Sequence, residues 1–172
     1  MAKETKILMG GAAFLILLIV GFAFLLGKDT TPSKETSSEE TTVLGLELTP
    51  SFYDLGKVPI NGGIVTKDYQ VKNTFGKSLN LKKITTSCMC TTASVSVGDK
   101  TTKFFGMEGH GDKNPPVNLE VPEGETVKVT VNFDPAAHGP QGTGPFDRFV
   151  WLSFSDPAGV EELKFSGEVV SQ

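Results

Sequence analysis

Alternation of apolar and polar residues, repeated from about Val43 onward, is the feature that most constrains the fold. Val127, Val129, Val131 and Phe133 each have a polar residue on either side. A period of two indicates a strand with one buried and one solvated face, as in antiparallel sheets around a core. Further series of this kind comprise Val65, Tyr69 and Val71; Val150, Leu152 and Phe154; and Leu163, Phe165 and Val169.

Turn signals separate these series and set the length of the predicted strands. The signals are Asn61-Gly62-Gly63, Phe75-Gly76-Lys77, Pro122-Glu123-Gly124, Asp134-Pro135 and Asp156-Pro157-Ala158-Gly159. Roughly seven to nine short strands in residues 43–172 predict an all-β fold, an immunoglobulin-like antiparallel β-sandwich with Greek-key connections. Within this fold we expect Trp151 to be an interior or inter-strand residue of the core rather than a platform for a ligand.

An uncharged, strongly apolar run occupies Ile7–Gly27. At 1.5 Å per residue a helix of this length spans about 30 Å, the thickness of a bilayer core. A cleaved signal peptide is the alternative, but the small pair Gly21 and Ala23 lies inside the run rather than after it. We therefore predict a single N-terminal transmembrane helix, an uncleaved signal anchor, that precedes the sandwich.

The residues that flank this run suggest its orientation and a spacer. Lys3 and Lys6 precede it, so the positive-inside rule places a short tail, residues 1–6, in the cytoplasm. Residues 28–42 are rich in Ser, Thr and Glu, and almost without apolar side chains, so they are expected to form a disordered linker. The domain of residues 43–172 is then extracytoplasmic, either periplasmic or at the cell surface.

Charge and composition exclude several classes of function. The net charge is −4 and Arg148 is the single arginine, so we expect no nucleic-acid partner. The chain has only two histidines, no Gly-x-Ser-x-Gly motif and no pair of carboxylates arranged for general acid and base catalysis. We therefore expect the protein not to be an enzyme.

Several short strings occur in an order that resembles a known family. They are Phe52-Tyr53-Asp54-Leu55-Gly56-Lys57-Val58, Val71-Lys72-Asn73-Thr74-Phe75-Gly76, Ser87-Cys88-Met89-Cys90-Thr91, Asn132-Phe133-Asp134-Pro135 and Leu163-Lys164-Phe165-Ser166-Gly167. Together they resemble the bacterial family of domains of unknown function DUF1573, which is similar to the immunoglobulin-like modules of abnormal-spindle and hydin type. The resemblance covers roughly residues 46–170 and implies an envelope-facing β-sandwich of uncharacterised role. Met89 departs from it, since a glycine is usual there, and so does the long excursion of residues 99–116.

Cys88 and Cys90 leave three interpretations open. If both lie on one strand, residues i and i+2 point to the same face, and the two side chains are either a buried apolar pair or a disulfide. Extended geometry places their Cα atoms about 6.6 Å apart, near the upper limit for a disulfide. The third interpretation is a metal site.

Candidate metal ligands cluster near the two cysteines in the sequence. Met107 and His110 lie in the excursion, and His138 is a further candidate. Thiolate, thioether and imidazole ligands suit copper(I), while zinc would use the thiolates and imidazoles alone. In this interpretation His110 is expected to contribute more than His138.

Two functions from different classes are therefore predicted. The first is a membrane-anchored, non-catalytic module that binds or scaffolds another envelope protein. The second is an envelope metal-binding or thiol-redox protein that works through Cys88 and Cys90.

Overall fold

The computed structural model describes residues 45–110 and 114–171. These residues form ten strands and one short 3-10 helix, η2 (Gly139–Gly142). The strands are β1 (Leu46–Thr49), β2 (Phe52–Pro59), β3 (Val65–Asn73), β4 (Leu79–Thr86), β5 (Thr91–Val97), β6 (Lys100–Thr101), β7 (Leu119–Val121), β8 (Thr126–Phe133), β9 (Gly144–Ser155) and β10 (Ala158–Val170). No helix in this described part has the length and apolar character needed to cross a bilayer. The predicted anchor, residues 7–27, and the predicted linker, residues 28–42, lie outside the described residues.

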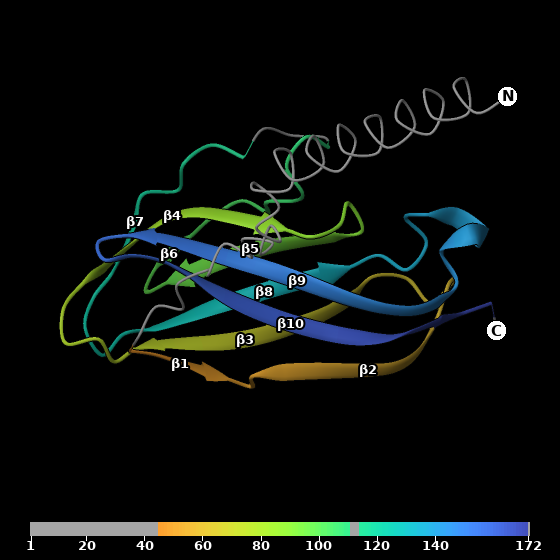
Figure 1. Ribbon diagram of the computed structural model, residues 1–172, viewed down its shortest axis with the longest axis horizontal. Helices are drawn as coiled ribbons and strands as arrows, with labels where there is room; N and C mark the ends of the chain where they lie inside the picture. Colours follow the sequence, from red (N-terminus) through yellow and green to blue (C-terminus); the bar gives the residue numbers. More distant parts are fainter. Residues whose placement is uncertain (1–44, 111–113, 172) are drawn as a thin grey trace, which may run out of the picture. The chain divides into compact units, whose positions relative to one another are not determined.

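The strands form two five-stranded sheets, and all the strands lie roughly along one common axis (Figure 1). One sheet has the order β1-β3-β8-β5-β6 and the other the order β2-β10-β9-β4-β7. The predicted all-β sandwich is confirmed at this level. The strand number is higher than expected because β6 and β7 are only 2 and 3 residues long, too short for a repeated alternation to identify them.

The first strands join the two sheets. β1 pairs with β3 in one sheet, and β2 pairs with β10 in the other, so the chain changes sheets near Pro50. The pairing of β2 with β10 is parallel, so this sheet is mixed, whereas the other pairings of the two sheets are antiparallel as predicted. A bulge interrupts this pairing beside Gly167, where an added Cβ atom would lie 2.8 Å from the carbonyl oxygen of Gly56. Glycine at position 167 thus allows the two strands to approach closely.

The core follows the predicted alternation. Every apolar member of the β8 and β9 series is buried, as are Leu163, Phe165 and Val169 of β10. Trp151 lies on the opposite, outer face of β9, so its prediction as an interior residue is wrong, although it does contact the neighbouring strand β10. Its ring stacks on Phe149 with a centroid distance of 6.0 Å, and its Nε1–H donates to Glu162 at 2.9 Å.

The long excursion packs partly against the sandwich. β6 continues β5 as a short hairpin. Phe105 is buried, and its backbone pairs with Ala93 of β5 in both directions at 2.8 Å, whereas Phe104 is exposed. The excursion therefore has one aromatic anchor beside β5.

Candidate cysteine and histidine site

Cys88 and Cys90 lie in the tight turn that joins β4 to β5, rather than on a strand. The N–H of Thr91 donates to the carbonyl oxygen of Cys88 at 3.1 Å and closes this turn. The buried hydroxyl of Thr86 lies 3.0 Å from the Cys88 carbonyl oxygen and 2.9 Å from that of Thr91. One side chain therefore connects both ends of the turn, which restricts its conformation.

The two cysteines form a disulfide within this turn. Their Cα atoms are 5.2 Å apart, so the separation expected from an extended strand is wrong, because the turn shortens the path between them. Cys88 is 7% exposed and Cys90 is 3% exposed, so the sulfurs also belong to the border of the core. The interpretations as a buried pair and as a disulfide are therefore compatible.

His138 reaches the disulfide from the loop of residues 134–143, which follows β8. The N–H of Asp134 donates to the carbonyl oxygen of Cys90 at 2.8 Å, and its carboxylate accepts the N–H of Ala136 at 2.9 Å. These bonds fix the start of the loop beside the cysteine turn. Nε2 of His138 lies 3.1 Å from Sγ of Cys88. A Cβ atom at Gly142 would lie 2.8 Å from Cβ of His138, so the loop requires glycine there.

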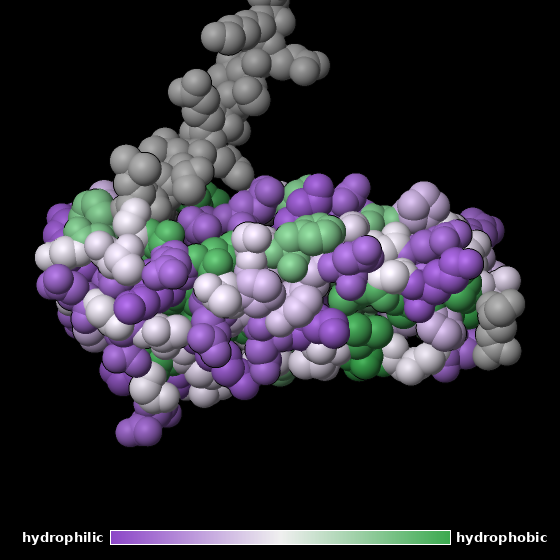
Figure 2. Space-filling model, turned by 90° about the horizontal axis from the view of Figure 1, so that it is seen from below, coloured by the Kyte–Doolittle hydropathy of each residue, from purple (hydrophilic) through white to green (hydrophobic). Residues whose placement is uncertain are grey.

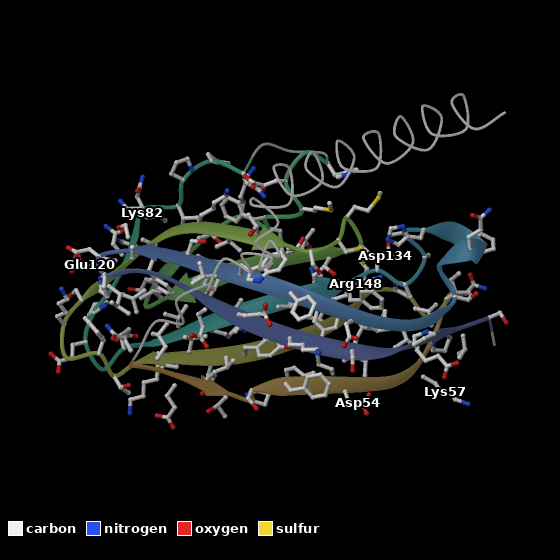
Figure 3. The ribbon with its side chains drawn as sticks, viewed as in Figure 1. Asp54, Lys57, Lys82, Glu120, Asp134 and Arg148 are labelled. Carbon is white, nitrogen blue, oxygen red and sulfur yellow. A yellow bond between two sulfur atoms is a disulfide. The ribbon has the colours of Figure 1, made fainter. Side chains whose placement is uncertain are left out.

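Arg148 reaches the disulfide from β9, in the sheet that also contains β4. It occupies the inward-facing series of β9, between the buried residues Phe146 and Val150. Its Nε–H donates to Sγ of Cys90 at 3.1 Å, and Nη1 donates to the carbonyl oxygen of Asp147 at 2.8 Å. Burial lowers the pKa of Arg148, and the nearby Asp147 carboxylate partly offsets this effect. Figure 3 shows Arg148 and Asp134 close together beside the turn that carries the sulfurs.

Each sulfur has two donors or potential donors around it. Sγ of Cys88 accepts the N–H of Cys90 at 3.2 Å and lies beside His138. Sγ of Cys90 accepts from Arg148 and lies 3.6 Å from the hydroxyl of Thr91. Arg148 was not among the predicted site residues, although the alternation of Phe146, Arg148 and Val150 places it on the inner face of β9.

The structure groups some of the predicted metal ligands and not others. The ligand atoms of Cys88, Cys90 and His138 lie within 4.8 Å of one another. His110 is exposed in a short turn, where its N–H donates to the carbonyl oxygen of Met107 at 3.4 Å, and it lies outside this group. Met107 is half-buried. The geometry thus favours His138 over His110 as the nitrogen ligand, the reverse of the order expected from the sequence.

A shallow hollow borders the His138 loop. It has a volume of about 220 Å³ and lies between that loop and the end of β2. Its lining residues are Ile60, Asn61, Ala136, Gly139, Pro140, Thr143 and Ser171. The hollow, the His138 loop and the cysteine turn therefore adjoin at one end of the sandwich.

Comparison with known proteins agrees with the family resemblance. A family model described as "Protein of unknown function (DUF1573)" matches residues 46–102, which confirms the predicted resemblance over β1 to β6 and the cysteine turn. The match ends before His138 and Arg148. No curated protein matches the chain.

Solved structures with some likeness to the chain come from varied proteins. A protein of unknown function from Porphyromonas gingivalis W83 is 18% identical, with a TM-score of 0.48, over 72% of this chain and 46% of that one. A family 123 glycoside hydrolase from Clostridium perfringens is 10% identical, with a TM-score of 0.48, over 71% of this chain and 23% of that one. The CooA pilin subunit from enterotoxigenic Escherichia coli is 12% identical, with a TM-score of 0.40, over 74% of this chain and 99% of that one. This chain thus spans less than half the length of the first two proteins.

Proposed function

We propose that the protein is a membrane-anchored, extracytoplasmic and non-catalytic immunoglobulin-like module that binds another envelope protein. The apolar run of residues 7–27 is the proposed anchor, with residues 1–6 in the cytoplasm and residues 28–42 as the linker. Support comes from the sandwich fold, whose loops and edges commonly serve for docking.

One observation carries the proposal. Three loops meet at one end of the sandwich, which we call the binding end: the cysteine turn (87–90), the His138 loop (134–143) and the β2–β3 loop (60–64). Ile64 in the β2–β3 loop is 64% exposed, and Met89 in the cysteine turn is 51% exposed. Figure 2 shows several apolar patches along one face of the molecule, one of them in its right half. Exposed apolar side chains around a hollow are typical of protein interaction sites.

Site-specific crosslinking tests this proposal. A photoreactive amino acid is placed at Ile64 or at Met89 of the full-length chain in its native host. We expect one discrete protein adduct from both positions, and none from Lys77, an exposed control in the β3–β4 loop. Equal labelling at all three positions would contradict a dedicated binding end.

The anchor has its own test. Because the apolar run lacks a cleavage site at its end, the mature protein should retain Met1 or Ala2 and remain with the membrane fraction after alkaline washing. A mature amino terminus within residues 24–29 would overturn the anchor and leave the binding end untouched.

A soft-metal site is the second candidate function, favoured by the convergence of Cys88, Cys90 and His138 within 4.8 Å. Once the disulfide is reduced, two thiolates and an imidazole suit copper(I) in a three-coordinate site, or zinc with one further ligand. Arg148 would offset part of the thiolate charge and donate to a metal-bound sulfur.

Titration of the reduced full-length chain with copper(I) or zinc(II), against a competing chelator, tests this site. Cys88→Ser and Cys90→Ser should each remove most of the affinity, and His138→Ala a substantial part. His110→Ala is the matched control and should change little, while Met107→Leu tests whether the thioether contributes to copper(I) binding alone. Affinities weaker than about micromolar for both metals would rule out a metal function.

A further inference from the structure

We propose that the Cys88–Cys90 disulfide is a thiol–disulfide exchange centre that oxidises a dithiol of another extracytoplasmic protein, with His138 and Arg148 as positioning residues. The proposal uses the same sulfurs as the metal site but does not depend on metal binding. It also does not depend on which protein the binding end contacts.

The donors around the sulfurs carry the argument. A disulfide sulfur is a weak hydrogen-bond acceptor, whereas a thiolate accepts strongly. Here the N–H of Cys90 lies 3.2 Å from one sulfur, and Nε–H of Arg148 lies 3.1 Å from the other. Nε2 of His138 lies 3.1 Å from the first sulfur and is a donor in the tautomer that carries the proton there. This environment therefore favours the two thiolates more than it favours the disulfide, and a disulfide whose reduced form is stabilised acts as an oxidant.

Arg148 supplies an independent observation. Within the part of the chain that the structure describes, no carboxylate oxygen lies within 4.0 Å of its guanidinium, although it faces inward on β9. Its charge is offset only in part, by the more distant Asp147 carboxylate and by the Phe146 ring, whose centroid lies 5.6 Å from Cζ. Reduction would give it an anionic partner in direct contact at Cys90, in the hydrogen bond that already exists.

The surroundings distinguish the two sulfurs. Cys88 is the more exposed cysteine, and the side chain beside it, His138, is itself exposed. Cys90 lies deeper, between Thr91 and Arg148. We therefore assign Cys88 as the sulfur that a partner attacks and Cys90 as the leaving sulfur.

The exchange balances in two steps. A partner thiolate attacks Sγ of Cys88, the bond between Cys88 and Cys90 breaks, and its electron pair leaves on Cys90, beside Arg148. The second thiolate of the partner then attacks the partner's first sulfur, which is bonded to Cys88 in the mixed disulfide. This attack releases Cys88 as a thiolate, beside His138. The partner dithiol loses two electrons and two protons and becomes a disulfide, while Cys88 and Cys90 gain the two electrons. The two protons go to solvent or to the released thiolates.

Redox equilibrium of the full-length chain with dithiothreitol tests the proposal, with metal chelators present throughout. The reduced fraction is measured by alkylation and mass spectrometry, first for the folded chain and then for the chain unfolded in urea. We expect the folded chain to be the more easily reduced, because only the folded state places donors around the thiolates. A folded disulfide that is harder to reduce than the unfolded one would overturn the proposal, whatever the metal titration shows.

Variants then separate positioning from packing. Arg148→Met should lower the equilibrium constant for reduction about tenfold, the size expected for a hydrogen bond to a charged group. Arg148→Lys keeps the cation and should recover part of this loss. Lys164→Met removes a neighbouring cation, which pairs with Asp147 rather than with sulfur, and should leave the equilibrium unchanged. Equal equilibria for the wild type and Arg148→Met would exclude a role for Arg148.

The single-cysteine variants test the assignment of the sulfurs. With oxidised glutathione as the probe, Cys90→Ser, which retains Cys88, should form the mixed disulfide at least about tenfold faster than Cys88→Ser. The opposite order would reverse the assigned roles and contradict the step written above.

Discussion

The inner face of β9 differs between its middle and the end that meets the disulfide. In the middle, Val150 and Leu152 are completely buried among apolar side chains. Two positions before Val150, on the same face, Arg148 carries a charge that is hydrogen-bonded to sulfur and to a carbonyl oxygen. The difference shows that a strand can carry an ionised group on its inner face where partners at the border of the core receive it.

Glu161 offers the contrasting case on β10. It lies opposite Leu152 on the inner face and is buried, yet its Oε2 atom has no hydrogen-bond partner in the described part of the chain. Burial, and then the neighbouring Glu162, raises the pKa of Glu161. Arg148 thus has polar partners, whereas one oxygen of Glu161 has none, and the two are expected to affect stability differently.

A positive charge placed in the middle of β9, instead of at position 148, gives the largest expected change in the free energy of unfolding. Val150→Lys places an ammonium group at a completely buried position and should lower the free energy of unfolding by more than about 3 kcal/mol. Arg148→Met, the matched control in the oxidised protein, should change it by less than about 1 kcal/mol, since an apolar side chain replaces a partly buried charge. Urea unfolding measures both, and similar losses would contradict the distinction between the two positions.

Opposite faces of β8 give an intermediate effect. Val129→Ala or Val131→Ala removes buried methyl groups and should cost about 1–3 kcal/mol of unfolding free energy. Thr130 faces outward, and its hydroxyl donates to Asp68 at 2.6 Å, so Thr130→Ala should cost less than about 1 kcal/mol. If Thr130→Ala costs more than either valine substitution in thermal unfolding, the inner and outer faces of β8 have been assigned wrongly.

Glu161 gives the smallest effect, through pH. Because the pKa of Glu161 is raised in the folded state, that state binds the proton more tightly than the unfolded chain does. Its contribution to stability therefore improves as pH falls from neutral through the raised pKa, and levels off below the ordinary value near 4.5. Glu161→Gln should stabilise the protein by about 1 kcal/mol at neutral pH and remove this pH dependence. If Glu161→Gln leaves the pH dependence of the unfolding free energy unchanged, the buried carboxylate of Glu161 does not destabilise the folded state.

Alternation allowed most of the fold to be predicted. The series around Val129, Leu152 and Phe165 identified three strands and their inner faces, because burial on one face forces a period of two. The same rule places Trp151 outside and Arg148 inside, and following it strictly would have avoided the error at Trp151 and found Arg148. At both positions the alternation gives the correct face, whereas the residue type, an aromatic at 151 and a cation at 148, suggests the opposite face.

The site itself could be predicted only in part. The sequence singled out Cys88 and Cys90, but Ser87 and Met89 give no glycine or proline signal for the turn that brings the cysteines together. His138 is distant in sequence, and it reaches Cys88 only because β5 pairs with β8 and a bond between Asp134 and Cys90 directs the following loop. Contacts between residues that are distant in sequence depend on the order of the strands in the sheets, and the local pattern of apolar and polar residues does not specify that order.

The parallel pairing of β2 with β10 has a consequence for the order of folding. Position 52 pairs with position 164, so one of the earliest strands to be synthesised obtains its neighbour only when one of the last emerges. Pairings between distant positions form late, because loop closure must precede them. During synthesis both edges of β2 are therefore unpaired until β10 arrives, and one edge stays unpaired afterwards because β2 is the outer strand of its sheet. The interval before β10 arrives is when the chain is most open to chaperones and to pairing with a second copy.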